Sequence, residues 1–428
     1  SDHIWRNALF RLLVEQPWPA TVEGSPGELP LTYYFGFWLP AALVGKVGGM
    51  ALGWAALLAW TAVGIGIFVF LVLSLVKRWS VWPVAVFAVF GGMDLVEKAL
   101  WGTADSFSQP YSVEFIDRWP LYAFTSFGDQ LTTVFNQSIP AWILTALVLL
   151  QRNGRAAIAL CALGLLESPL PMVGLAVIAG VLMLTGPIGA PAEGAPKGWG
   201  RLRVALTDAI SPQNLAIGAA CLAVFGPFFA SSLNHNGLAL QLPQTGTDFA
   251  RLALFYVFEF GVIFALVGKG LRGSALWWTA LGTMLVLPLL RLGAYNDLAM
   301  RAVIPAQVVI CLLVCWTLAR IERPWRSPRA AALIVVIALG AGSTLHGVYW
   351  YGLFDIRAVE KLAKDGDWSQ ARSDLMAKPD LWGKGVFESR YWPQYFGDPD
   401  SLFYRHLART PSSLHSNSAH LGNKADLP

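Results

Sequence analysis

Three stretches of the sequence carry acidic and basic side chains of the kind that transfer a group from a phosphate. They begin at Asp2, at Asp94 and at Arg291. A carboxylate can take the proton of an attacking hydroxyl group, and a guanidinium group can stabilise the charge that develops on a departing phosphate. One carboxylate and one or two arginines therefore suffice for transfer from a donor that already carries a phosphate leaving group.

The stretch from Arg291 to Arg301 is a short connection between two apolar segments. Guanidinium groups present fork-like donors that match phosphate oxygens, so Arg291 and Arg301, together with Tyr295, are the predicted contacts of a donor phosphate. Asn296 and Asp297 would then order the connection. Alternatively, Asp297 and Arg301 satisfy one another, because residues four apart on a helix are neighbours.

Asp94 and Glu97 lie three residues apart in GGMDLVEKALWG and share one face of a predicted helix. A charged side chain at the centre of a bilayer costs about 2.5–3.5 kcal/mol on insertion scales, so both carboxylates should face a cavity or a partner. One interpretation is an acceptor or metal site beside the carboxylate that would act as the base, for which Asp2 is the candidate. The other is an internal pair with Lys98 and a neighbouring helix.

Three further side chains are weaker candidates. His3 and His235 lie in predicted outer loops, where they could contact an acceptor or a phosphate, although a lone loop histidine is more often solvated. Glu259 falls near the middle of the apolar run LFYVFEFGV. It must be paired or protonated there, and either a structural partner or a role in transport would explain it.

The composition indicates that the bilayer is the solvent of this chain. Hydrophobic residues make up 55% of the 428 positions, charged residues only 14%, and the mean hydropathy is +0.51. These values lie outside the range of soluble domains. The formal charge is only +4 and no basic run is interleaved with exposed aromatics, which argues against a nucleic-acid partner.

Ten apolar runs are long enough to be crossings, and they predict an all-α polytopic membrane protein with about ten transmembrane helices. The polar start Ser1–Asn7 predicts that the chain begins in a loop, so that a preceding helix would make eleven. Residues 31–46, interrupted by Pro40, predict a juxtamembrane or re-entrant helix. The predicted crossings are 50–76, 81–101, 138–151, 155–167, 169–186, 213–232, 249–269, 274–292, 300–319 and 329–350.

The basic residues of alternate loops predict the orientation of these crossings. One set of loops holds thirteen Lys and Arg residues and the other holds five, and the richer set should be cytoplasmic. The three stretches with candidate chemistry then fall on the outer side. The predicted organisation is an outer loop with the juxtamembrane helix at 1–46, a transmembrane domain at 47–350, an outer C-terminal segment at 351–408 and a disordered tail at 409–428.

The first segment suggests a family. Asp2 is followed by the Pro-rich Pro17-Trp18-Pro19 and by the aromatic run Leu31-Thr32-Tyr33-Tyr34-Phe35-Gly36. An acidic residue after a first membrane helix, a Pro-rich stretch and an aromatic juxtamembrane helix resemble the GT-C superfamily of membrane glycosyltransferases, which includes protein mannosyltransferases and lipid A aminoarabinose transferases. The chain departs from that pattern in lacking the first helix.

The resemblance implies a membrane enzyme with its active site on the outer side. The compact loops and the Ala/Gly/Leu-rich composition favour a bacterial inner membrane, so that the outer side would be the periplasm. Its donor would be a polyprenyl-phosphate sugar, its acceptor a lipid, a glycan or a protein, and Asp2 the catalytic base. No cofactor is required by this chemistry, and participation of a divalent metal is left open. The alternative for Asp2 is a solvated loop carboxylate. The alternative function is that of a polytopic transporter or lipid flippase, which would place its binding site near the middle of the membrane.

Overall fold

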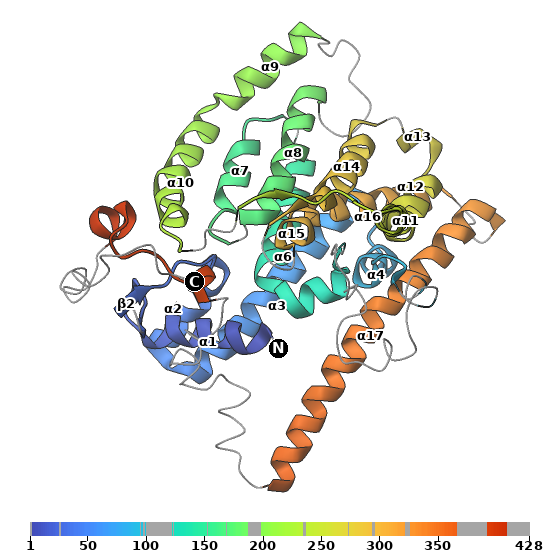
Figure 1. Ribbon diagram of the computed structural model, residues 1–428. Helices are drawn as coiled ribbons and strands as arrows, with labels where there is room; N and C mark the ends of the chain where they lie inside the picture. The colour runs from blue at the N-terminus through green and yellow to red at the C-terminus, as the bar shows by residue number, and fades with distance from the viewer. Residues whose placement is uncertain are drawn as a thin grey trace.

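The computed structural model describes most of the chain, and its secondary structure is mainly helical (Figure 1). At residues 2–5, 23, 24, 27, 269, 350–365 and 392 it describes the backbone only. The described residues are 2–24, 27–94, 96, 99, 122, 124–151, 153–167, 169–186, 198–233, 237–272, 274–292, 296–321, 326–365 and 392–408.

Six helical stretches among the described residues are long and apolar enough to cross a membrane. Two shorter apolar helical stretches, Pro169–Thr185 and Ala275–Leu289, accompany them. All eight coincide with predicted crossings, so the prediction of a helical protein with membrane-spanning segments is confirmed, whereas a count of ten is not. The six are Met50–Val76, Phe127–Leu150, Pro212–Ala230, Gly246–Leu266, Asp297–Ala319 and Pro328–Tyr349.

The predicted crossings 81–101 and 155–167 correspond to short helices. Helix α4 (Val81–Val89) ends at Phe90, and the backbone then runs without helical structure to Met93. Neighbouring groups occupy the space that a side chain at residue 91 or 92 would need, so glycine fits at these positions. A Cβ atom on Gly91 would lie 3.2 Å from the carbonyl oxygen of Gly340. Helix α7 (Ala157–Leu163) has only seven residues.

The N-terminal part is more ordered than the sequence analysis expected. Helix α1 (Asp2–Glu15) occupies the stretch that was predicted to be a loop, and its buried face is formed by Leu9, Phe10 and Leu13. A hairpin follows, in which β1 (Thr21–Gly24) pairs antiparallel with β2 (Gly27–Pro30). The apolar positions of α1 recur at helical spacing, so the helix could have been recognised from them.

The predicted juxtamembrane helix is present as a short turn, η1 (Gly36–Trp38), followed by α2 (Leu39–Gly48). Pro40 does not interrupt it. Proline lies in the first turn of α2, where a missing N–H donor costs nothing. Gly49, with a φ of 84°, then allows the sharp reversal into α3 (Met50–Val76).

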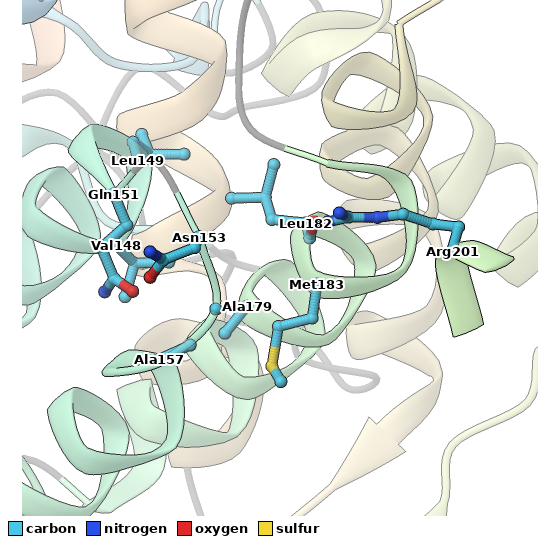
Figure 2. Close-up of a pocket in the computed structure, with 10 residues that line it drawn as sticks. Val148, Leu149, Gln151, Asn153, Ala157, Ala179, Leu182, Met183 and Arg201 are labelled. Carbon is cyan, nitrogen blue, oxygen red and sulfur yellow. Dashed lines mark hydrogen bonds between the residues drawn. The ribbon is translucent and has the colours of Figure 1, made fainter. Parts of the chain in front are cut away.

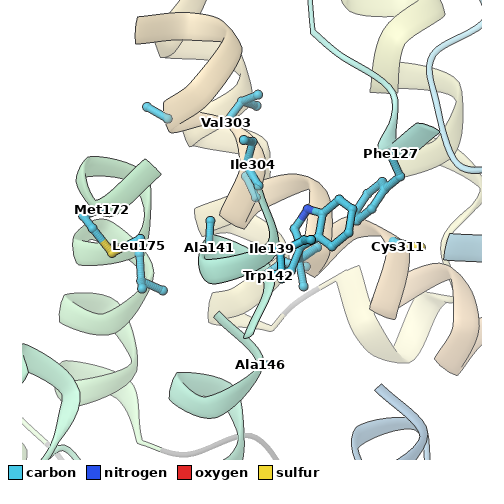
Figure 3. Close-up of a cluster of buried hydrophobic side chains, with 14 of the residues drawn as sticks. Phe127, Ile139, Ala141, Trp142, Ala146, Met172, Leu175, Val303, Ile304 and Cys311 are labelled. Carbon is cyan, nitrogen blue, oxygen red and sulfur yellow. The ribbon is translucent and has the colours of Figure 1, made fainter. Parts of the chain in front are cut away.

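Helices α6 (Phe127–Leu150) and α16 (Ile304–Ala319) occupy the centre of the molecule, with α10 (Pro212–Ala230) and α17 (Pro328–Asp365) at opposite sides (Figure 1). Figure 3 shows the packing of Trp142 and Ile139 from α6 with Ile304 from α16 and Leu175 from α8 (Pro169–Thr185). Helix α6 begins eleven residues before the predicted crossing because the Ser126 side chain accepts a hydrogen bond from the Asp129 amide and caps it.

The remaining elements connect these helices. Helix α17 continues without a break through 350 into the region where a separate outer segment was predicted. Two residues of β3 pair antiparallel with two of β4. The elements are α9 (Trp199–Ala209), β3 (Ala239–Leu240), α11 (Gly246–Tyr256), the π-helical turn η3 (Val257–Gly261), α12 (Val262–Leu266), α13 (Lys269–Arg272), α14 (Ala275–Val286), η4 (Leu287–Leu289), β4 (Leu290–Arg291), α15 (Asp297–Ala302), η7 (Trp392–Tyr395) and the π-helical turn η8 (Phe403–Leu407).

Candidate functional site

Tyr33 and Tyr34, which follow the β1–β2 hairpin, bring two of the three predicted stretches together. Their ring centroids lie 3.7 Å apart. Asp297 and Arg301 of α15 both act on the hydroxyl group of Tyr34, and Arg6 of α1 acts on both tyrosines. The first and third stretches therefore meet at this pair. We call Arg6, Tyr33, Tyr34, Asn296, Asp297, Arg301 and Tyr395 the arginine–tyrosine cluster.

Arg301 is buried in the cluster with part of its guanidinium group unsatisfied. Its side chain is only 9% exposed, and its Nη1 atom has no hydrogen-bond partner among the described residues. A buried charged donor without a partner is costly, unless a ligand supplies the acceptor. A phosphate oxygen is an acceptor that suits a guanidinium group well.

Asn296 lies next to α15 in the left-handed region, with a φ of 55°, and is 2% exposed. Asparagine tolerates this conformation better than most residues. Its side chain does not cap α15, and neither Oδ1 nor Nδ2 has a hydrogen-bond partner within the described part of the chain. The amide therefore adds a second donor beside Arg301.

The phenol groups of the cluster are neutral donors at physiological pH. Burial raises the pKa of Tyr33 well above its ordinary value, and neighbouring Tyr34 and Tyr395 raise it further. Burial also raises the pKa of Tyr34, and Asp297 adds to this effect, while a hydrogen bond from Tyr33, then Arg301 and Arg6, lower it. The Tyr33 hydroxyl group donates its single hydrogen to Tyr34, so the Tyr34 hydroxyl group is the one that can donate to an anion, and it does so without adding negative charge.

The C-terminal segment forms one wall of the cluster, which the sequence analysis missed. The amide of Thr32 donates to the carbonyl oxygen of Tyr395 at 2.8 Å. The Tyr404 hydroxyl group donates to the carbonyl oxygen of Leu31 at 2.9 Å, and the Leu233 amide donates to Phe396 at 2.9 Å. Residues 392–404 are therefore joined both to the cluster and to the end of α10. The aromatic run Tyr-Trp-Pro-Gln-Tyr-Phe at 391–396 was the only local signal.

A network of buried amide side chains supports Arg301 from the membrane side. Gln307 lies six residues after Arg301, in α16, and its Nε2 atom donates to the carbonyl oxygen of Thr125 at 3.0 Å. Gln130 Nε2 donates to Gln307 Oε1 at 2.7 Å, and Trp142 Nε1 donates to Gln130 Oε1 at 2.8 Å. Satisfied buried networks of this kind rigidify their surroundings, so the start of α16 is held in one position.

Asp94 belongs to a different environment. Its Oδ2 atom accepts a hydrogen bond of 2.8 Å from the Ser343 hydroxyl group of α17, and its side chain is buried. Close by, the Met93 amide donates to the carbonyl oxygen of Phe258, and the Glu259 carboxylate packs against Gly92. A neighbouring helix thus satisfies Asp94, in line with the second interpretation of that stretch, and Glu259 lies next to the helix break.

The other predicted residues are placed less completely. Arg291 lies in β4, opposite Ala239, at the far end of the connection that leads to Asn296. Asp2 and His3 form the first turn of α1, and their side chains are outside the described residues. Because Asp2 and Arg6 are four residues apart, they share one face of α1. Outside the described residues lie Glu97, Lys98, His235 and Tyr295.

Glu167 is a further acidic residue near the cluster, and the sequence analysis did not name it as a candidate. It precedes α8, and a Cβ atom on Gly36, two residues after Tyr34, would lie 2.7 Å from Glu167 Cγ. The Gly36 amide donates to the carbonyl oxygen of Leu166 at 3.3 Å. Burial raises the pKa of Glu167 to about 7, which is the range in which a carboxylate can exchange protons at neutral pH.

Glu167→Gln should change how stability depends on pH. Because the pKa of Glu167 is raised on folding, its protonated form stabilises the wild type below about pH 4.5, and this contribution is lost as pH rises through about 7. The variant should avoid this loss and gain about 3 kcal/mol over wild type at pH 8, but nothing at pH 4. Thermal unfolding in detergent across this range measures the difference. Glu15→Gln, at an exposed position, is the control, and parallel curves for Glu167→Gln and wild type would contradict the assignment.

The groups that converge in the cluster are donors to anions rather than ligands of metals. Among the described residues no group of three or more His, Cys, Asp and Glu side chains could hold a metal ion. The guanidinium, amide and phenol groups instead offer N–H and O–H donors. No protein-family model, curated protein or solved structure matches this chain.

Proposed function

We propose that the chain is a membrane glycosyltransferase that takes a sugar from a polyprenyl-phosphate donor and passes it to a lipid, glycan or protein acceptor. The observation that carries this proposal is the pair formed by Arg301 and Asn296, two buried side chains with unsatisfied donors beside two neutral phenols. This set of donors suits the phosphate of such a carrier. The proposed site faces the exterior of a bacterial inner membrane.

The position of the cluster also suits a lipid-linked donor. Arg301 lies three residues before Ile304, where helix α16 begins, and most residues of this helix are apolar and buried. A phosphate at Arg301 would therefore lie where the hydrocarbon region ends. The polyprenyl chain of the donor can then remain among the lipids while its sugar extends toward Tyr33 and Tyr34.

In the proposed reaction Asp2 accepts the proton of the acceptor hydroxyl group as its oxygen attacks the anomeric carbon. The bond from that carbon to the phosphate oxygen breaks, and the electron pair leaves with the phosphate. Arg301 stabilises the charge that develops there, and Asn296 donates a further hydrogen bond. Arg6 lies one turn after Asp2 in α1, and this spacing supports the proposal of a base near the cluster. Direct displacement inverts the anomeric configuration.

Mass spectrometry of lipids that copurify with the protein tests the donor assignment. We expect a polyprenyl phosphosugar in the extract of the wild-type protein, and none in the extract of an unrelated polytopic membrane protein purified in the same way. The extracted lipid, returned to proteoliposomes, should lose its sugar to an added acceptor. An extract without any polyprenyl phosphate, together with no binding of added polyprenyl phosphate, would contradict the proposal.

A transporter or lipid flippase is the second candidate, and one observation favours it. The helix break at Phe90–Met93 lies against the π-helical turn η3, and the buried Glu259 is located there. Broken helices with a buried ionisable residue are typical of transporter binding sites. Glu259→Gln separates the two functions. It should leave sugar transfer unchanged if the protein is the proposed enzyme, whereas a transporter would lose movement of labelled lipid across sealed vesicles.

A further inference from the structure

A second polar pocket lies at the opposite end of the bundle from the arginine–tyrosine cluster. Helix α6 begins beside the network under Arg301 and ends at this pocket, roughly 36 Å away for a helix of 24 residues. The enclosed part of the pocket has a volume of about 20 Å³, and the empty space that includes its open mouth is about 310 Å³. Its wall includes Leu149, Gln151 and Asn153 after α6, Met183 of α8 and Arg201 of α9 (Figure 2).

Arg201 and Gln151 leave donors and an acceptor unsatisfied in the pocket. In Figure 2 the side chain of Arg201 extends from α9 across Leu182 toward the pocket, and its Nη2 atom donates to the Leu182 carbonyl oxygen at 3.2 Å. The Nε atom of Arg201 and both amide atoms of Gln151 are buried without a hydrogen-bond partner among the described residues. A ligand that satisfies all three must combine an acceptor oxygen with an O–H or N–H donor, and an anionic oxygen is the acceptor that suits a guanidinium group best.

The acidic group nearest the pocket does not cancel the charge of Arg201. The Asp208 carboxylate accepts a hydrogen bond from the Gly154 amide at 2.8 Å and pairs with Arg155 at 3.4 Å. Arg203, two residues after Arg201 in α9, is exposed. The pocket therefore has a local excess of positive charge, which favours an anion.

Helix α9 indicates that the ligand belongs to the membrane. Three exposed apolar side chains share one face of α9 and its C-terminal end, because they are spaced seven and four residues apart. They are Trp199, Leu206 and Ile210. An amphipathic helix with an exposed tryptophan and flanking arginines is typical of an element that lies in the lipid headgroup region. Arg201 would then face its pocket at the depth of the headgroups.

We propose that this pocket binds the headgroup of an anionic phospholipid that carries both a phosphate and free hydroxyl groups, as phosphatidylglycerol does. The guanidinium group of Arg201 donates to the phosphate, and the Gln151 amide accepts from a headgroup hydroxyl group and donates to an oxygen. By the charge of its loops this end of the bundle is cytoplasmic, so the lipid would come from the inner leaflet. The proposal is independent of the proposed function.

Native mass spectrometry of the full chain in detergent micelles, titrated with phosphatidylglycerol, tests the proposal. Arg201→Gln should lower the affinity for phosphatidylglycerol by about tenfold or more, since a charge-assisted bond to phosphate is lost. Arg203→Gln makes the same change at an exposed position of the same helix and should alter the affinity by less than about twofold. Phosphatidylcholine is zwitterionic and has no free hydroxyl groups, so it should not bind to the wild type or to either of the two variants.

Gln151→Leu separates a binding role from a structural one. The leucine removes two unsatisfied buried atoms, so thermal stability without lipid should be equal to or higher than that of wild type, while phosphatidylglycerol binding falls. Equal lipid binding by wild type, Arg201→Gln and Gln151→Leu would overturn the proposal. Displacement of the lipid by excess inorganic phosphate would also overturn it, because the pocket would then be a site for a free anion.

Discussion

Replacing Arg301 by glutamine should reduce sugar transfer by about a hundredfold or more, with the larger part of the loss in kcat. The guanidinium group has a free Nη1 donor within the described structure, and in the proposed reaction it stabilises negative charge on the leaving phosphate. Removal of one such donor from an enzyme site commonly costs a factor of about 10² to 10³. Single-turnover transfer from a labelled polyprenyl phosphosugar in proteoliposomes measures the effect.

Two further variants make that result specific. Arg301→Lys keeps the charge but loses the planar fork, so it should recover only part of the activity. Arg11→Gln, on the exposed side of α1, removes an arginine that pairs with Glu15 and should leave transfer at the wild-type rate. Thermal unfolding of each variant in detergent identifies any loss of folded protein. Full transfer by folded Arg301→Gln protein would exclude a role for Arg301 at the phosphate.

Asp2→Asn should abolish turnover while binding of the donor persists. Asparagine is nearly isosteric with aspartate but cannot accept the proton of the acceptor hydroxyl group, and general bases contribute a factor of about 10² to 10⁴. Donor binding depends instead on Arg301 and Asn296, so it should change by less than about threefold. Initial rates of transfer, together with retention of labelled donor on the purified protein, measure the two effects separately.

Glu15→Gln, at the other end of α1, is the matched control for this experiment and should retain full activity. If Asp2→Asn also remains active, Asp2 has no part in proton transfer. Glu167 would then be the next base to test, because burial raises its pKa to about 7 and it lies against Gly36, two residues from Tyr34. Loss of transfer in Glu167→Gln together with activity in Asp2→Asn would assign the proton to Glu167.

The lengths of the apolar runs predicted most of the spanning helices. A crossing needs about 20 apolar residues, and this requirement does not depend on which helices pack against it. One of the two failures has a visible cause. The run 81–101 is apolar throughout its first part, but Gly91 and Gly92 let Gly340 and Glu259 approach so closely that a helix cannot continue. Hydropathy does not report such contacts, which depend on residues more than 150 positions away.

The candidate site could be predicted in part, for a similar reason. The run around Asn296, Asp297 and Arg301 was recognisable because charges next to an apolar helix need partners. Which helices supply those partners could not be read from local pattern. For Asp94 the sequence left open whether it faces an acceptor site or a neighbouring helix, and its hydrogen-bond partner is Ser343, about 250 positions away. The direction in which a helix runs fixes the depth of a side chain in the membrane but not its lateral neighbours.

The join between residues 392–404 and the aromatic residues of the first 34 has a consequence for biosynthesis. Membrane proteins are made from the N-terminus, and every apolar helix described here precedes Trp392. A nascent chain can thus complete its insertion while Tyr33 still lacks Tyr395 and Tyr404 is not yet bonded to Leu31. Premature termination at 391 would leave a protein that occupies the membrane but lacks one wall of the arginine–tyrosine cluster, so the cluster is completed only after residues 392–404 have left the ribosome.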